Sequence, residues 1–310
     1  MPTCYPHFRV TIQFGNQSDL VLNRPHPPAV LRIVQSTIQQ TYYRNGQLRE
    51  AVSVRKNLRH GVSHTWHKNG RRATEEHYAN GLLHGLCRQW SEAGRLLGKY
   101  QMVHGTGIQL AWHDNGKPQI EVSTVQGAFC GHSRIWLSDG ALLSERFYLH
   151  GNAVSVDEYR KAAAADKLLP KFRGKPGKPL PRTLATQKRI HRLFVQSLLA
   201  KPDRAEARQW LTKQAGDKTK RMLGRFKSEQ AAVKFVEMLY TAGAREVIVP
   251  DLYRNKARDQ FADCLLVKLP KSAPTRKAIR KVCEQLRTRR LGAMEPEKDM
   301  GETHLYLMLA

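Results

Sequence analysis

The chain has 310 residues and a formal net charge of +26 at pH 7, so it is long enough for two domains that each bury a core. The charge predicts attraction to a polyanion, namely nucleic acid, an anionic membrane surface or an acidic protein, and does not select among them. The five scattered cysteines contain no C-x-x-C pair and no apolar run approaches the length of a bilayer, so we expect a cytoplasmic protein without a disulfide framework, zinc site or cofactor.

The first segment, residues 1–41, is expected to form a cap. Within it, Phe8–Phe14 alternates apolar and polar residues, which predicts a strand with one face on a core. A stack of strands with an open end needs such a shield to stay soluble. We therefore expect residues 1–41 to cover one end of the elements that follow.

Residues 42–156 contain one short phrase five times, in which an aromatic residue is followed closely by a small or polar residue and Gly. The aromatic residues are Tyr43, Trp66, Trp90, Trp112 and Trp136, at intervals of 23, 24, 22 and 24 residues. A period of this length is typical of stacked repeats, in which each unit packs only against its neighbours. We expect these five rings to occupy equivalent places and to pack on one another and on the next hairpin.

Each repeat is predicted to be a β-hairpin. Four of the five phrases end in Asn-Gly or Asp-Gly, the strongest signal for a two-residue type I′ turn, which needs positive φ at both central residues. A looser turn is expected after the second strand. It contains a His-Gly pair in most copies, and we interpret these histidines as turn residues rather than metal ligands: His60, His84, His104 and His150.

This pattern of an aromatic residue, Asn-Gly, a strand and a His-Gly turn resembles the bacterial variant of the MORN repeat. The resemblance covers the first half of the chain and depends on five copies in register. Ala93 replaces Asn in the third copy, Cys130 replaces His in the fourth, and Pro118 predicts an edge or bulged strand. The resemblance implies a protein-interaction or scaffolding module, sometimes associated with membranes, whose repeats have no catalytic activity.

Residues 157–186 combine a predicted helix, from Asp157 to Leu169, with a basic linker. From Pro170 to Arg182 the frequent Pro and Gly residues forbid regular structure, and the like charges repel one another. The linker is either a cationic tether for phosphates and acidic surfaces or a solvated spacer. The candidate polyanion-binding residues of the linker and of the next helix are Lys171, Arg173, Lys175, Lys178, Arg182, Lys188, Arg189 and Arg192.

The last two predicted parts are a helical hairpin over residues 187–216 and an α/β domain over residues 217–310. Pro202 is expected to start the second helix of the hairpin. The pattern from residue 217 onward reads strand, helix, strand, strand, helix, strand, which is the ferredoxin-like order. The expected fold class is therefore α+β: a sheet of MORN-like hairpins, a helical hairpin and a ferredoxin-like two-layer sandwich.

No phosphate-binding loop, zinc-protease motif or nucleophile elbow is present in the sequence, so we expect a protein that is not an enzyme. The first hypothesis is a scaffold whose repeat surface binds a protein partner, with a basic C-terminal half. The alternative is a nucleic-acid-binding protein that uses the basic linker and helices. A weaker alternative is peripheral binding to anionic membrane lipid through the same charges.

Overall fold

The computed structural model describes residues 36–212, 216–309 without 292–298, and these divide into two compact units. One, the repeat unit, takes in the described residues 36–41 and 48–180, and the other, the C-terminal unit, takes in residues 42–47 and the described residues from Pro181 onward. The predicted strand Phe8–Phe14 and most of the predicted cap lie outside the described residues. The boundary at Leu180 places most of the basic linker in the repeat unit.

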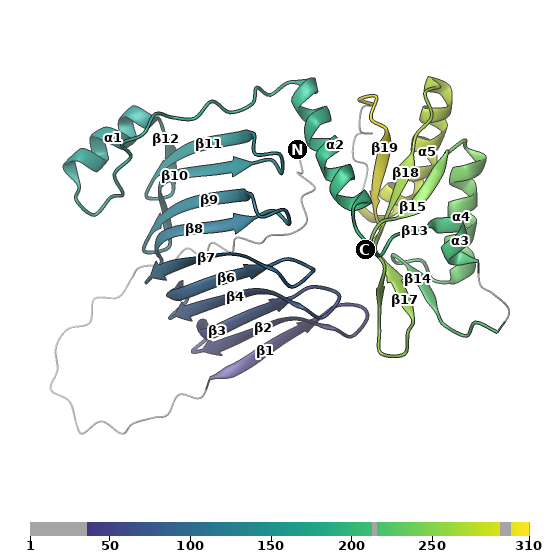
Figure 1. Cartoon of the computed structure of the whole chain (residues 1–310), viewed down its shortest axis with the longest axis horizontal. Coiled ribbons are helices and arrows are strands. Elements are labelled where there is room, and N and C mark those ends of the chain that lie inside the picture. The colour runs from purple at the N-terminus through teal and green to yellow at the C-terminus, as the bar shows by residue number, and fades with distance from the viewer. Residues whose placement is uncertain (1–35, 213–215, 292–298, 310) are drawn as a thin grey trace. The chain divides into compact units, whose positions relative to one another are not determined.

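The repeat unit is built on one twelve-stranded sheet in which strands follow one another in chain order (Figure 1). Every strand pair whose register is recorded is antiparallel, as a series of hairpins requires. Strand β5 pairs only with β4, and β6 continues the sheet. The strands are β1 (Thr37–Tyr42), β2 (Leu48–Arg55), β3 (Leu58–Trp66), β4 (Arg72–Ala79), β5 (Leu82–Leu83), β6 (Gly85–Trp90), β7 (Leu96–Val103), β8 (Thr106–Trp112), β9 (Pro118–Val125), β10 (Ala128–Trp136), β11 (Leu142–Leu149) and β12 (Asn152–Val154).

The two kinds of turn are the reverse of the prediction. In the turn that follows Trp66, only Gly70 has positive φ, and Gly70 N donates to His67 O at 2.9 Å, which is a type I turn with a left-handed glycine. The type I′ turns are the other set, where both central residues have positive φ. These turns are Lys56-Asn57, Asn80-Gly81, His104-Gly105, Gln126-Gly127 and His150-Gly151. Asn-Gly alone did not distinguish the two sets, because both conformations need a left-handed glycine.

His60 and His84 do not lie in these two-residue turns. Each is followed by a glycine of positive φ inside or beside a strand, at a place where the strand pairing is interrupted. Gly131, after Cys130, has the same role, and a Cβ there would lie 2.7 Å from the Ser123 Cβ. The second set of glycines predicted as turns therefore divides into true turns and β-bulges, which bend each long strand.

The hydrogen bonds of the turns also correct one position in the predicted aromatic series. Tyr43 N donates to Gln47 O in the way that His67 N donates to Arg71 O. Tyr43 is therefore equivalent to His67, and Tyr42, the last residue of β1, is equivalent to Trp66. Two adjacent tyrosines made the first copy ambiguous, because its phrase is one residue shorter than the others.

Helix α1 (Val156–Ala165) and the chain after it close the last hairpin (Figure 1). Ser155 caps the helix: its hydroxyl accepts from Glu158 N, and the Glu158 carboxylate accepts from Ser155 N. Tyr159 and Ala163 pack with Phe147 of β11 and Leu169 in a small buried cluster. The helix predicted from Asp157 is thus present, and it covers apolar surface at this end of the sheet.

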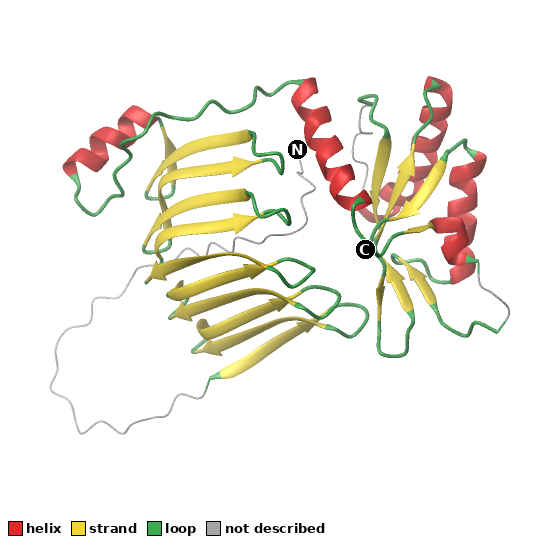
Figure 2. Cartoon of the chain, in the orientation of Figure 1, coloured by secondary structure: helices red, strands yellow, loops and turns green. Residues whose placement is uncertain are grey.

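The C-terminal unit has a four-stranded antiparallel sheet between layers of helices (Figure 2). One cluster of buried residues joins the sheet to α3, α4 and α5, and a smaller one joins it to α2. The elements are α2 (Leu184–Leu199), β13 (Ala205–Glu206), α3 (Ala207–Leu211), β14 (Arg221–Leu223), α4 (Glu229–Thr241), β15 (Glu246–Val249), β16 (Tyr253–Arg254), β17 (Gln260–Ala262), β18 (Cys264–Lys268), α5 (Ala273–Leu291) and β19 (His304–Met308).

Two predictions for this unit are wrong. The helical hairpin is not formed, because the chain after α2 makes the short strand β13 and the five-residue α3, which begins after Glu206 rather than at Pro202. A ferredoxin-like sheet would hold the first predicted strand between the third and the fourth. Instead β18 pairs directly with β19, and β14 pairs in parallel with β17 in a separate three-stranded sheet. β14 ends at Leu223 and is followed by Gly224, which has a φ of +49°.

Candidate interaction surface

Side chains at the aromatic end of the hairpins connect each repeat to the next. In two copies an Asn side chain accepts from the backbone of its own turn and donates to a carbonyl of the following turn: Asn69 to Glu92 O at 2.9 Å, and Asn115 to Ser138 O at 2.7 Å. Ala93 cannot form these bonds. Arg95 N donates to the Ser91 hydroxyl instead, at 3.2 Å, and the Arg95 side chain donates to Asp114 O at 2.6 Å, as Arg71 does to Glu92 O. The Asn of the repeat phrase is thus a link between repeats as well as a turn residue.

A second series of bonds connects the repeats at the opposite end of the hairpins. His60 Nδ1 accepts from Asn80 N at 3.3 Å, and His84 Nδ1 accepts from His104 N at 3.2 Å. Cys130 takes the same place as these histidines, since its Sγ accepts from His150 N at 3.2 Å. The recurrent histidines are therefore hydrogen-bonding residues of the stack. The described residues contain no group of three metal-ligating side chains.

The aromatic residues that end alternate strands pack on the hairpins beside them. The Trp112 ring lies where a side chain on Gly98 would be, since a Cβ there would approach the ring to 2.2 Å. The Arg72 guanidinium lies 5.7 Å from the centre of the Trp90 ring, and the His64 and Trp66 ring centres are 5.8 Å apart. Because a strand separates neighbouring aromatic residues, their spacing is about 10 Å, so the rings contact the intervening strand.

One face of the sheet carries a row of mostly charged residues, and we call it the front face. Its residues are paired across neighbouring strands: His64, Glu75, Arg88 and Lys99 in the first half, and Leu110, Glu121, Arg134 and Glu145 in the second. Glu75 is bonded to His64 at 3.3 Å, to Arg72 at 2.8 Å and to Arg88. Burial alone would raise the Glu75 pKa, but these bonds outweigh it and hold the pKa below its usual value.

Next to this row, the front face presents apolar side chains whose exposure changes along the sheet. Val62 on β3 and Ile108 on β8 are exposed, Ile108 by 45%. Phe147 on β11 belongs to the same face, where it pairs with His132, and it is only 6% exposed. The difference arises because the chain after α1 covers the last hairpin and leaves the earlier ones open.

The covering chain is part of the predicted linker, and its contacts are specific. The Phe172 ring meets the Phe147 ring edge-on at 4.8 Å and lies 5.7 Å from the His132 ring. The guanidinium groups of Arg134 and Arg160 lie 5.7 and 5.6 Å from its centre, within the range of cation–π attraction. This stretch is therefore docked on the sheet, and the prediction of a solvated spacer does not describe it.

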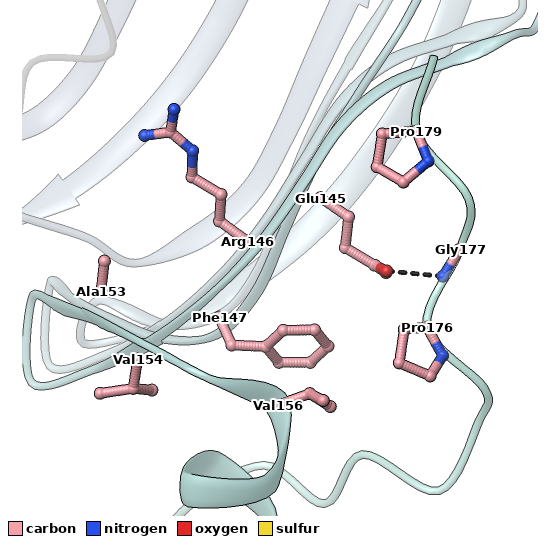
Figure 3. Close-up of a pocket in the computed structure, with 9 residues that line it drawn as sticks. All are labelled: Glu145, Arg146, Phe147, Ala153, Val154, Val156, Pro176, Gly177 and Pro179. Carbon is pink, nitrogen blue, oxygen red and sulfur yellow. Dashed lines mark hydrogen bonds between the residues drawn. The ribbon is translucent and has the colours of Figure 1, made fainter. Parts of the chain in front are cut away.

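Backbone bonds continue the docking up to the end of the repeat unit. Gly177 N donates to Glu145 Oε2 at 2.6 Å, as Figure 3 shows, and Leu180 N donates to Leu142 O at 2.8 Å. Between this stretch and β11 lies an open hollow of about 340 Å³, with Phe147, Val154 and Pro176 in its lining. The Glu145 side chain is 3% exposed and also accepts from Arg134. The docked chain thus satisfies a carboxylate that it buries.

The eight candidate polyanion-binding residues divide between the two units. Lys171, Arg173, Lys175 and Lys178 are exposed on the docked chain of the repeat unit. Arg182 precedes α2, while Lys188, Arg189 and Arg192 lie on it, and of these four only Arg189 is half-buried. The apolar side of α2 packs on the sheet, with Val195 against Ile248 and Leu266. The structure therefore places the eight residues on two separate segments, four on the docked chain and four at α2.

The contacts of Phe172, Glu145 and Arg160 were not predicted from the sequence. Phe172 was visible as the one aromatic residue in a stretch of Pro, Gly and Lys, and that contrast is the signal that could have identified it. The partners come from β10, β11 and α1, 12 or more residues earlier in the chain. No helix within the described residues is long and apolar enough to cross a membrane.

Residues 37–55 match the MORN repeat variant family. The match covers β1, the turn after it and β2, which is one hairpin of the sheet. No curated protein and no solved structure matches the chain. The later hairpins repeat the turns and side-chain bonds described above, so the whole sheet is built from units similar to the matched one.

Proposed function

We propose that the protein is a scaffold rather than an enzyme, and that the front face of its repeat sheet binds a protein partner. MORN repeats are commonly protein- or membrane-binding modules. The observation that carries the proposal is the docked chain on the last hairpin, because it is an example of a polypeptide bound to this face. The same face of the earlier hairpins is open.

The contacts of Phe172 indicate what the face accepts. The Phe172 ring packs next to the charged row of the front face, at the position of His132 and Phe147. The Gly177 N–H bonds to the charged row itself, at Glu145. On the open hairpins, the positions equivalent to His132 hold the exposed apolar residues Val62 and Ile108. A partner segment that lies across the strands would bury these side chains and exclude water from the neighbouring ion pairs.

The charged row of the front face determines which partner segments the open hairpins can accept. Lys99 is exposed and occupies the place that Glu145 occupies in the last hairpin, so the partner there must offer an acceptor instead of a donor. Glu75 is already bonded to two arginines and a histidine. The partner segment is therefore apolar or aromatic with acidic or carbonyl groups beside it, the complement of the basic chain that covers the last hairpin.

Affinity capture with the full chain tests the proposal. The immobilised protein is exposed to a nuclease-treated cell lysate, and the variant I108D is compared with I135D. Ile135 follows Arg134 on β10 and therefore lies on the opposite face of the sheet, where it is 36% exposed, so I135D is the matched control. We expect a discrete protein to be retained by the wild type and I135D and lost with I108D, since a buried carboxylate opposes docking. Retention by I108D equal to that of I135D would refute a role for the front face.

We also propose that the protein acts in the cytoplasm, in agreement with the state of its cysteines. Cys87, Cys130, Cys264 and Cys283, the four within the described residues, are buried and form no disulfide bond. Buried thiols outside disulfide bonds are ordinary in a reducing compartment. Fractionation of cells that express the tagged full chain tests this point, and recovery in a secreted or periplasmic fraction contradicts it.

A further inference from the structure

The docked chain from Lys171 to Lys178, here called the basic segment, alternates residues that hold the sheet with residues that face water. Phe172 packs on the sheet, Gly174 O accepts from Arg160 at 2.8 Å, and Gly177 N donates to Glu145. The charged side chains of the segment are all cationic and exposed: Lys171, Arg173, Lys175 and Lys178. The anchoring therefore displays four positive charges in a row.

These charges are not neutralised by the protein. Arg173, Lys175 and Lys178 form no ion pair with any residue that the structure describes, and Lys171 donates to a backbone carbonyl, that of Asp166, at 3.1 Å. The carboxylate next to the segment, Glu145, is used by Arg134 and Gly177 N. The segment itself contains no acidic residue. Its positive charge is thus available to an external anion.

The row is also ordered before any ligand arrives. A free Lys- and Gly-rich chain would lose backbone entropy on binding, whereas the bonds at Phe172, Gly174 and Gly177 already hold this one in place. Alternate residues of a nearly extended chain are roughly 7 Å apart. Cations at such a spacing can follow a linear polyanion with one charge per monomer.

We infer that the basic segment binds the phosphate backbone of a nucleic-acid strand and does not read its sequence. Phosphate contacts from Lys and Arg give affinity without base specificity. The only aromatic residue of the segment, Phe172, packs against Phe147 and is not presented for stacking on bases. This binding site is distinct from the front face of the open hairpins and goes beyond the proposed scaffold function.

The test compares two triple variants of the full chain that change the net charge equally. R173E/K175E/K178E reverses the row, and K234E/K277E/K281E reverses three exposed lysines on α4 and α5. The probe is a fluorescein-labelled oligothymidylate of about 20 nucleotides, with affinity measured by anisotropy over a series of salt concentrations. Circular dichroism confirms that each variant is folded, and R173Q/K175Q/K178Q replaces the first variant if the reversal does not fold.

We expect the wild type to bind with an affinity that falls steeply with salt, and the segment variant to bind at least tenfold more weakly. The slope of log affinity against log salt concentration should decrease by about 2 for three lost phosphate contacts on a single strand. The control variant should change affinity by less than about threefold. No binding by the wild type at low salt, or equal losses in both variants, would overturn the inference.

A variant of Leu168 distinguishes binding to a lipid surface from binding to nucleic acid, because this apolar residue lies beside the segment and is 81% exposed. L168S removes an apolar side chain that could enter a bilayer but leaves every cation in place. We expect L168S to bind the oligonucleotide like the wild type. Binding of the wild type to phosphatidylserine vesicles without binding to the oligonucleotide, together with loss of vesicle binding in L168S, would assign the segment to membranes and refute the inference.

Discussion

The two units of this chain are stabilised in different ways. In the C-terminal unit, twenty buried apolar residues from its helices and sheets form one cluster. In the repeat unit, the corresponding cluster has five buried residues and lies at one end, while side-chain bonds between residues 20 to 23 positions apart join neighbouring hairpins. A loss in the first unit should spread through it, whereas a loss in the second should stay near one repeat.

The largest loss of stability is expected from a substitution that leaves a cavity in the buried cluster of the C-terminal unit. Leu265 on β18 is fully buried in the cluster, so L265A should lower the free energy of unfolding of the C-terminal unit by about 3 kcal/mol. Hydrogen exchange resolved along the chain, in a series of urea concentrations, measures each unit separately. Protection in residues 48–180 should not change, and the surface variant K234A serves as the control. An equal loss in both units would show that they unfold together.

A bulge glycine of the repeat unit should give the next largest effect. Gly131 has a φ of +109°, and a Cβ there would lie 2.7 Å from the Ser123 Cβ. G131A should therefore cost about 2 kcal/mol from backbone strain and overlap. In the turn glycine Gly140, with a φ of +96°, a Cβ would meet only the end of Lys117 at 3.8 Å, so G140A should cost about half as much. Urea midpoints from tryptophan fluorescence compare the two, and equal losses would contradict the role of the bulge.

The links between repeats should each contribute less. N115A removes the bond to Lys117 N at 3.0 Å and the bond to Ser138 O at 2.7 Å, and should cost about 1 kcal/mol because both groups are exposed to water. A93N restores the Asn of the third copy but should be nearly neutral, since the Ser91 hydroxyl already accepts from Arg95 N and Asp114 O already accepts from the Arg95 side chain. The same urea midpoints measure both variants. A large gain in A93N would mean that the bonds of Ser91 and Arg95 do not make up for the missing Asn.

The smallest effect is a difference in how the units respond to acid. Burial, with Lys268 nearby, holds the pKa of His304 in the C-terminal unit below its reference value of 6.5. The stability that this neutral histidine contributes is complete above pH 6.5 and is lost as the pH falls through the lower folded pKa. The pKa of Glu75 in the repeat unit is held below 4.5, so its contribution is lost only in stronger acid.

Urea midpoints of the two units at pH 7 and about pH 5 measure this difference. The C-terminal unit should weaken while the Glu75 contribution to the repeat unit is retained, and H304Q should remove the histidine's part of the loss. If H304Q and the wild type show the same change with pH, the buried histidine is not responsible. Glu246, which opposes the shift, and His191, which adds to it, are unchanged in this comparison.

Much of the repeat unit could be predicted from the sequence because its contacts are between neighbours in the chain. The hairpins, their number and their period follow from Trp66, Trp90, Trp112 and Trp136 and the glycines after them. What could not be predicted is the conformation of each turn. A glycine of positive φ is compatible with either turn type, and the choice depends on whether two or three residues remain between the paired strands. The same uncertainty about the length of the turn explains why Tyr43 was predicted at the position that Tyr42 occupies.

The C-terminal unit was harder to predict because its strand order depends on contacts between distant residues. The helices that begin after Ser228 and Ser272 were predicted from their caps and apolar spacing, and they are present as α4 and α5. Pro202 favoured a helix start, but the chain after it forms β13 beside β15, and the helix of this stretch, α3, begins only after Glu206. No pattern of neighbouring residues in the sequence predicts that β18 pairs with β19 rather than with β14.

By itself the sequence determined where the chain forms hairpins and helices, and where its positive charge is concentrated, because these properties depend on residues close together in the chain. Tertiary structure alone decided which surfaces are available. Phe172 turns a stretch with the composition of a flexible linker into a docked segment, because its partners on β11 and α1 are supplied by the fold. That contact separates the covered hairpin from the open ones, and orders the cations of the basic segment on the surface.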